Sequence, residues 1–119
     1  MSSLLCYPSL YHATTPEAYR SIVKDQLIKT LGYDKLIYTS VDPVEALMFC
    51  YFNKALTRPE IQALYMFEID GSLIDWAWAK EGADHSPLHF KAPVITLNQP
   101  ILIQMIRNVT IHDLSEFNK

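Results

Sequence analysis

The feature of this sequence that most restricts its fold is a pattern that occurs twice, a short apolar strand followed at once by a capped helix. Leu10-Tyr11-His12 is typical of a strand, and Thr14-Thr15-Pro16-Glu17 then carries the signals of a helix start. Either threonine can serve as the N-cap, proline suits the first turn, and Glu17 completes a capping box from Thr14. Residues 36–39 and Asp42-Pro43-Val44-Glu45 have the same order. The pattern predicts alternating strands and helices in the N-terminal half.

The two predicted helices differ in how they distribute apolar side chains. In the first, Ala18, Tyr19, Ile22 and Val23 fall on one face, which predicts an amphipathic helix packed on a sheet. The second, residues 44–56, is apolar on nearly every side before Arg58-Pro59 ends it. Such a helix is expected to be largely buried or to lie at a subunit interface, which leaves room for a dimer.

The remainder of the chain is rich in strands. Residues 63–69 predict a third strand turned by Asp70-Gly71, and residues 76–93 predict a long loop or short helix. Further strands are predicted at 94–97, 101–106 and 109–112, with turns or bulges at 98–100 and 107–108. Mixed strands and helices followed by a strand-rich tail indicate an α+β fold and not a doubly wound α/β fold.

Composition limits the class of protein further. The chain has 119 residues, half of them apolar, which fits one domain over residues 1–119 with one core. Its net charge is −3 and its basic residues are scattered, so nucleic-acid binding is not indicated. We expect a cytoplasmic protein, because residues 1–11 do not resemble a signal peptide and no stretch is apolar enough for a membrane span. Cys6 and Cys50 are too few for a disulfide scaffold, and Cys50 is expected to pack as a small hydrophobe.

Polar side chains at strand ends are the first candidates for a site. His12 ends the first strand, and Tyr38 and Ser40 end the second. The alternatives are structural: His12 could bond a neighbouring backbone group, and Tyr38 could belong to the core. After the third strand, Asp70 suits a turn, whereas Asp75 has no such obvious role and could stabilise a developing positive charge.

Other familiar sites are not indicated by the sequence. Asp84-His85 and His89 could imitate a metal pair, but a His-x-x-x-His pair requires a helix and Pro87 interrupts it. The chain has three glycines and no glycine-rich phosphate loop. No metal site is therefore predicted.

Taken in order, these segments resemble the ADP-ribosyltransferase fold, in the branch that holds NAD with a histidine and a tyrosine. The resemblance covers residues 10–75 and runs from Leu10-Tyr11-His12-Ala13-Thr14 through Leu36-Ile37-Tyr38-Thr39-Ser40, a helix containing Ala46, and a strand over 64–69. It is similar to the small rifampin ADP-ribosyltransferases, to small phage-type members and, more distantly, to the poly-ADP-ribose polymerase core. The resemblance implies a small split sheet, mixed or antiparallel, with two principal helices.

The resemblance also implies NAD as a substrate and assigns residues to it. His12 would bond the ribose and nicotinamide region beside the Ala13 backbone, and Tyr38 would line the nicotinamide pocket. Asp75 would stabilise charge on the ribose as the glycosidic bond breaks. Further binding residues would be Thr14, Ser40, Tyr51 as a second aromatic wall, and Gln99. Gln99 stands where the larger family has a catalytic glutamate, and an amide can bind a ribose hydroxyl but supplies no negative charge.

Three functions follow as hypotheses. The first is a mono-ADP-ribosyltransferase that uses an unknown acceptor, with His12, Tyr38 and Asp75 in one cleft. The second is a catalytically inactive member that binds a ligand or partner, such as a phage or bacterial anti-defence regulator, with an exposed apolar surface near Trp76 and Trp78. The third is an unrelated α+β interaction protein. The enzyme hypothesis requires the imidazole and the phenol to face each other across one nucleotide-sized hollow, and rings on opposite sides of the sheet would exclude it.

Overall fold

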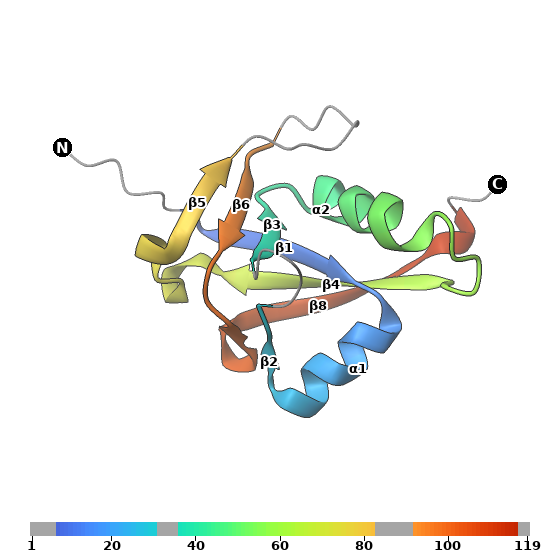
Figure 1. Cartoon of the computed structure of the whole chain (residues 1–119), viewed down its shortest axis with the longest axis horizontal. Helices are drawn as coiled ribbons and strands as arrows, with labels where there is room; N and C mark the ends of the chain where they lie inside the picture. Colours follow the sequence, from blue (N-terminus) through green and yellow to red (C-terminus); the bar gives the residue numbers. More distant parts are fainter. Residues whose placement is uncertain (1–6, 31–35, 83–91, 117–119) are drawn as a thin grey trace.

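The computed structural model describes residues 7–30, 36–82 and 92–116, and it contains two α-helices and eight strands within these ranges. The elements are β1 (Ser9–Thr14), α1 (Pro16–Asp25), β2 (Leu27–Ile28), β3 (Ile37–Ser40), α2 (Pro43–Cys50), β4 (Ala63–Asp70), β5 (Ala79–Gly82), β6 (Val94–Leu97), β7 (Ile101–Leu102) and β8 (Ile106–Asp113). Six strands form one sheet in the order β5-β6-β3-β1-β4-β8, and β2 pairs with β7 in a second (Figure 1). The pairings between these strands are antiparallel. The predicted α+β class is confirmed.

Both helices begin at side-chain caps. Thr15 Oγ1 accepts a hydrogen bond from the Ala18 amide at 3.3 Å, so Thr15 is the N-cap of α1 and the capping box expected from Thr14 is wrong. Asp42 Oδ1 accepts from the amides of Val44 and Glu45 at 2.8 and 3.3 Å, as predicted for α2. These caps fix where the chain leaves β1 and β3.

The second helix differs from its prediction in shape and burial. It is α-helical only to Cys50 and continues as a π-helical turn, Tyr51–Ala55. Val44 and Leu56 are 62% and 53% exposed, so the helix is not buried on every side. Cys50 is buried as expected, and its burial raises the pKa of the thiol to about 11.

The two helices cover opposite faces of the sheet (Figure 1). Successive side chains of β4 point to opposite faces, so alternate residues of β4 contact α1 and α2. On one face, Tyr19 of α1 stacks on Tyr65 and Phe67, with ring centroids 4.1 and 5.9 Å apart. On the other, α2 packs against β1 and β4 in a cluster that contains Ala13, Ala46, Leu47, Cys50, Leu64 and Met66. The larger cluster, on the α1 side, contains Leu10, Ile37, Phe67, Ile69, Ile95 and Leu97.

The sheet is split between β1 and β3. β1 pairs with β4 along its whole length, from Ser9 opposite Asp70 to Thr14 opposite Tyr65. It pairs with β3 only where Tyr11 lies opposite Ser40. The two strands therefore separate beyond this pair, and the gap lies beside His12.

The C-terminal part departs from prediction in two places. The strand expected over 101–106 is broken, since a 3-10 turn, Ile103–Met105, separates β7 from β8. The turn or bulge expected at 107–108 is a bulge inside β8, where the register with β4 shifts. In the predicted loop, a 3-10 turn (Trp76–Trp78) leads into β5, while Asp84, His85, Pro87 and His89 lie outside the described residues. Among the described helices, none has the length and hydropathy of a transmembrane segment.

Candidate ligand-binding cavity

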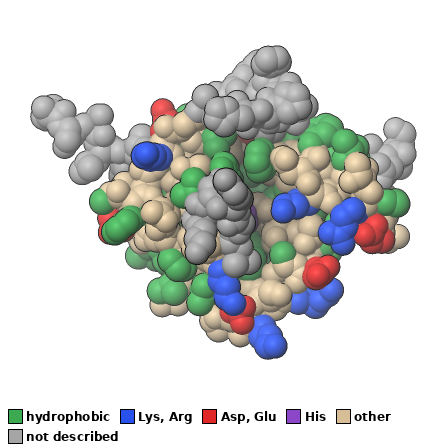
Figure 2. Space-filling view, viewed as in Figure 1, with side chains coloured by type: hydrophobic (Ala, Val, Ile, Leu, Met, Phe, Trp, Pro, Cys, Tyr) green, Lys and Arg blue, Asp and Glu red, His purple; other side chains and the backbone are tan. Residues whose placement is uncertain are grey.

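The gap between β1 and β3 opens into a cavity of about 790 Å³. Residues of β1, α1 and β2 border one side of it, and residues of β3 and α2 border the other. In the space-filling view a histidine is visible in a recess near the middle of the molecule, and Lys and Arg side chains gather beside and below it (Figure 2). The volume lies within the roughly 300–1,000 Å³ that small-molecule sites occupy.

His12 is the central polar group of this cavity, and its orientation is fixed. The ring is half-buried, and Nδ1 lies 2.8 Å from the carbonyl oxygen of Tyr38. A carbonyl oxygen can only accept, so Nδ1 carries the proton and donates it. In the neutral ring Nε2 is then an acceptor, and it has no hydrogen-bond partner among the described residues.

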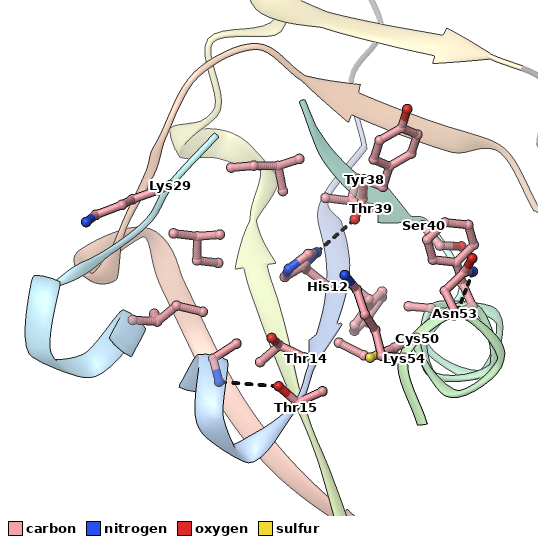
Figure 3. A pocket seen from close by; sticks show the side chains of 18 of the residues that line it. His12, Thr14, Thr15, Lys29, Tyr38, Thr39, Ser40, Cys50, Asn53 and Lys54 are labelled. Carbon is pink, nitrogen blue, oxygen red and sulfur yellow. Dashed lines mark hydrogen bonds between the residues drawn. The ribbon is translucent and has the colours of Figure 1, made fainter. Parts of the chain in front are cut away.

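The surroundings of His12 favour the neutral ring. Burial lowers the pKa of His12 below its ordinary value of 6.5, and the positive charge of Lys54 lowers it further, although the hydrogen bond to Tyr38 opposes both effects. Figure 3 shows the Lys54 side chain reaching from the end of α2 toward the imidazole. The cavity thus holds a neutral acceptor and a cation close together.

Most of the other polar side chains in the cavity are already occupied. Thr39 Oγ1 donates to the carbonyl of Ile95 at 2.8 Å, and Ser40 Oγ accepts from the Asp42 amide at 3.0 Å. In contrast, the Thr14 hydroxyl and the Lys54 ammonium have no hydrogen bond or ion pair within the part of the chain that the structure describes. These two groups, with Nε2 of His12, are therefore available to a ligand.

The other charged side chains that border the cavity are paired. Lys29 Nζ lies 3.0 Å from an Asp25 oxygen, and Arg58 lies 3.9 Å from a Glu17 oxygen. The carboxylate of Glu45 accepts from the Ala92 amide at 3.1 and 3.2 Å. Lys54 is the cation of this lining without a described partner, which gives the cavity a position for an anion.

Five of the residues predicted to form a site border this cavity: His12, Ala13, Thr14, Tyr38 and Ser40. His12 and Tyr38 do not face each other, however. Side chains alternate along β1 and β3, so the imidazole lies on the α1 side and the phenol on the α2 side. The Tyr38 ring lies nearly parallel to that of Phe49, with centroids 6.0 Å apart, and points away from His12 (Figure 3). Tyr38 therefore holds the His12 ring through its backbone carbonyl oxygen and not through its phenol. The expectation that the two rings face each other across one hollow is wrong.

Asp75 and Gln99 lie outside the cavity, beside each other. Asp75 Oδ1 caps the Trp76–Trp78 turn by accepting from the Ala77 amide at 3.1 Å, and Gln99 Nε2 donates to the Asp75 carbonyl at 2.9 Å. The cause is the antiparallel pairing of β4 with β1, which places the end of β4 at the start of β1. His12 is three residues further along β1 than Ser9, which lies opposite Asp70 at the end of β4, a distance of about 10 Å. The single cleft expected for His12, Tyr38 and Asp75 is thus not formed.

Two other aromatic or acidic candidates have structural roles. Tyr51 packs against the α2-side cluster and contacts Phe52 edge to face, with centroids 5.2 Å apart. Asp70 accepts from the Ser72 amide and lies 3.0 Å from Arg107. Its pKa is lowered, chiefly by the hydrogen bonds from Ser72. Neither residue borders the cavity.

Sequence reasoning missed Lys54, together with Asn53 and Thr15. Asn53 and Lys54 lie in the π-helical turn, whose wider winding alters the direction of side chains relative to a regular helix. The one sign in the sequence is that two polar residues interrupt an otherwise apolar helix near its end. In the described residues, no three His, Cys, Asp or Glu side chains group as metal ligands. No protein-family model matches the chain, and a search of curated proteins finds no match.

Proposed function

We propose that this chain is a catalytically inactive ADP-ribosyltransferase-like protein that binds NAD, or a closely similar nucleotide, in the cavity around His12. The enzyme hypothesis is set aside because the His12 and Tyr38 rings lie on opposite sides of the sheet. The observation that carries the proposal is the combination of a fixed acceptor, Nε2 of His12, with the ammonium of Lys54 in one cavity of about 790 Å³. Neither group has a partner among the described residues. A ligand that satisfies both must donate a hydrogen bond and carry a negative charge, and a nucleotide does both through its ribose hydroxyls and its phosphates.

Each part of such a ligand has a suitable group in the lining. A ribose hydroxyl would donate to Nε2 of His12, and a pyrophosphate oxygen would accept from Lys54. The hydroxyl of Thr14 can complete either contact. Apolar side chains from both helices border the cavity, among them Ile22 and Ala46, and provide surfaces for a flat ring.

Transfer of ADP-ribose is not part of the proposal. Breaking the glycosidic bond builds positive charge on the ribose, and Asp75 lies too far along the sheet to stabilise that charge. Glu45 is a carboxylate that borders the cavity, but the Ala92 amide already uses it.

Calorimetric titration of the full chain tests binding. NAD and ADP-ribose should bind with similar affinity if ribose and pyrophosphate supply most of the contacts, whereas nicotinamide alone should bind far more weakly. Absence of saturable heat with either nucleotide would contradict the proposal.

A second assay separates binding from transfer. Nicotinamide released from NAD is measured for the wild-type chain and for Glu45→Gln, which keeps an acceptor oxygen but removes the charge. We expect the wild-type chain to bind NAD without releasing nicotinamide. Release that is lost in Glu45→Gln while NAD affinity is kept would contradict the catalytically inactive assignment.

A further inference from the structure

Thr14 differs from the other buried polar residues of the cavity. Four polar residues are buried in the part of the chain that the structure describes, and all of them border the cavity: Thr14, Thr15, Thr39 and Ser40. The hydroxyl oxygens of Thr15, Thr39 and Ser40 each take part in a hydrogen bond within the chain. Thr14 is 8% exposed, and its hydroxyl has no partner among the described residues. Because buried hydroxyls are normally hydrogen-bonded, Thr14 points to a ligand group in the cavity.

The Thr14 side chain borders the same part of the cavity as His12. The two residues are separated by one position on β1, so their side chains project from the same face, about 7 Å apart along the strand. In Figure 3 the Thr14 hydroxyl points into the space that the imidazole of His12 and the side chain of Lys54 also border. One ligand can therefore contact all three groups.

The position of Thr14 favours negative charge. Thr14 directly precedes Thr15, the N-cap of the ten-residue helix α1, so its hydroxyl lies at the positive end of that helix. Thr15 accepts from two amides near the start of the helix, whereas the amide of Glu17 has no partner among the described residues. A phosphate oxygen suits such a position, because helix N-termini attract anions through their free amides and their dipole.

The charged side chains around this position leave it open to an anion. Lys54 lies close enough for its charge to lower the pKa of His12, so the ammonium acts on the same space. The carboxylate of Glu17 belongs to the first turn of α1, but it is 78% exposed and lies 3.9 Å from Arg58. The other carboxylates that border the cavity are also engaged within the chain.

We infer that the part of the ligand that this cavity recognises is a ribose 5′-phosphate unit, with a ribose hydroxyl at Nε2 of His12 and the phosphate between Thr14 and Lys54. The inference rests on the proposed nucleotide binding and narrows it. The Thr14 hydroxyl donates to a phosphate oxygen, since the ammonium and the helix start beside it favour the charged group over a neutral ribose hydroxyl. A ribose and its 5′-phosphate can bridge the distance of about 7 Å between the two positions on β1.

The base of the nucleotide is bound without being distinguished. Three of the four buried hydroxyls are engaged within the chain and the fourth contacts the phosphate. The rest of the buried lining is apolar, and it includes Ile22, Ile28, Ile37 and Val94. Contacts with the face of a base are similar for every base, whereas hydrogen bonds to its edges differ. We therefore expect adenosine and guanosine 5′-monophosphates to bind with similar affinity.

A ligand series measured by calorimetry on the full chain tests the inference. Adenosine should bind at least about tenfold more weakly than adenosine 5′-monophosphate, because the charge-assisted hydrogen bonds to the phosphate are lost. Ribose 5-phosphate should displace adenosine 5′-monophosphate, and ribose should not. Binding of NAD without binding of the monophosphates would overturn this inference and leave the proposed nucleotide site standing. Absence of binding by NAD and the monophosphates alike would overturn both, and a strong preference for one base would overturn the absence of base recognition.

A matched pair of variants tests the position of the phosphate. Thr14→Val removes the hydroxyl and keeps the shape of the side chain, so adenosine 5′-monophosphate should bind about tenfold more weakly and adenosine should be little affected. Thr14→Ser should restore the affinity. Thr39→Val is the control, because Thr39 borders the same cavity but its hydroxyl already donates to Ile95. Circular dichroism verifies that each variant is folded. An equal loss for the monophosphate and for adenosine in Thr14→Val, or an equal loss in Thr39→Val, would overturn the inference.

Discussion

The cavity around His12 and the corner formed by Asp75 and Gln99 both carry polar side chains, yet they use them differently. In the corner, Asp75 caps a 3-10 turn and Gln99 bonds the Asp75 carbonyl. In the cavity, Nε2 of His12 and the ammonium of Lys54 have no partner among the described residues. Lys54 is exposed, so water can satisfy its ammonium, whereas His12 is half-buried. Half-buried polar groups are normally satisfied, so Nε2 of His12, which has no described partner, indicates a ligand in the cavity. The corner is explained by local structure alone.

The largest expected effect is a loss of NAD affinity, and it is tested by replacing one residue from each region. His12→Ala removes the acceptor for a ribose hydroxyl, and we expect NAD affinity to fall about 5- to 150-fold, since a lost hydrogen bond in a half-buried site costs on the order of 1–3 kcal/mol. Asp75→Ala should leave NAD affinity unchanged. Calorimetry on both variants measures the contrast. Equal losses in the two would show that the regions form one site after all.

A smaller loss of NAD affinity is expected when the ammonium of Lys54 is removed. Lys54→Ala should weaken NAD binding about threefold to tenfold and reduce its dependence on salt, because an exposed ion pair with a phosphate is partly screened. Lys29→Ala is the matched control, since Lys29 borders the same cavity but is paired with Asp25. Fluorescence or calorimetric titration at two salt concentrations separates them. A greater loss in Lys29→Ala would place the anion on the other side of the cavity.

The pH dependence of stability tests the environment of His12. The pKa of His12 is lower in the folded chain than its ordinary 6.5, so the unfolded chain binds more protons between these two values. The free energy of unfolding should therefore decrease as pH falls through 6.5 toward the folded pKa. His12→Gln should reduce that slope in urea titrations at several pH values. An unchanged slope would mean that the ring is not desolvated.

The smallest effect belongs to the corner. Asp75→Ala removes a cap from a three-residue turn, and we expect the free energy of unfolding to fall by about 0.5 kcal/mol, at the low end for such caps. Asp42→Ala, which removes two cap hydrogen bonds from α2, should cost more, about 1–2 kcal/mol. Chemical denaturation measures both. A cost for Asp75→Ala well above that of Asp42→Ala would indicate a role beyond the turn.

The sequence predicted the local elements well because their signals are local. The strand at Leu10-Tyr11-His12, the cap at Asp42 and the third strand all lie where the pattern placed them. What it could not predict is how strands pair, because pairing depends on contacts between distant residues. Asp75 was expected near His12 because the resemblance implies a catalytic aspartate shortly after the third strand, whereas antiparallel pairing places the end of β4 at the start of β1, away from His12.

The site shows the same division between local and distant information. His12 and Thr14 were identified because they follow a strand and precede a cap. Lys54 was not, because the only sign of it in the sequence is that Asn53 and Lys54 interrupt an apolar helix, and the direction of its side chain depends on the π-helical turn. The side of the sheet on which Tyr38 points depends on register, which the tight pairing of Tyr11 with Ser40 sets.

The central claim, that a nucleotide binds around His12, is tested most directly by following the backbone amides of the isotopically labelled chain by NMR during titration with NAD. We expect saturable shifts of the amide signals of His12, Thr14 and Lys54, with the amide signals of Asp75 and Gln99 unmoved. Shifts concentrated at Asp75 and Gln99, or no saturable shift anywhere, would contradict it.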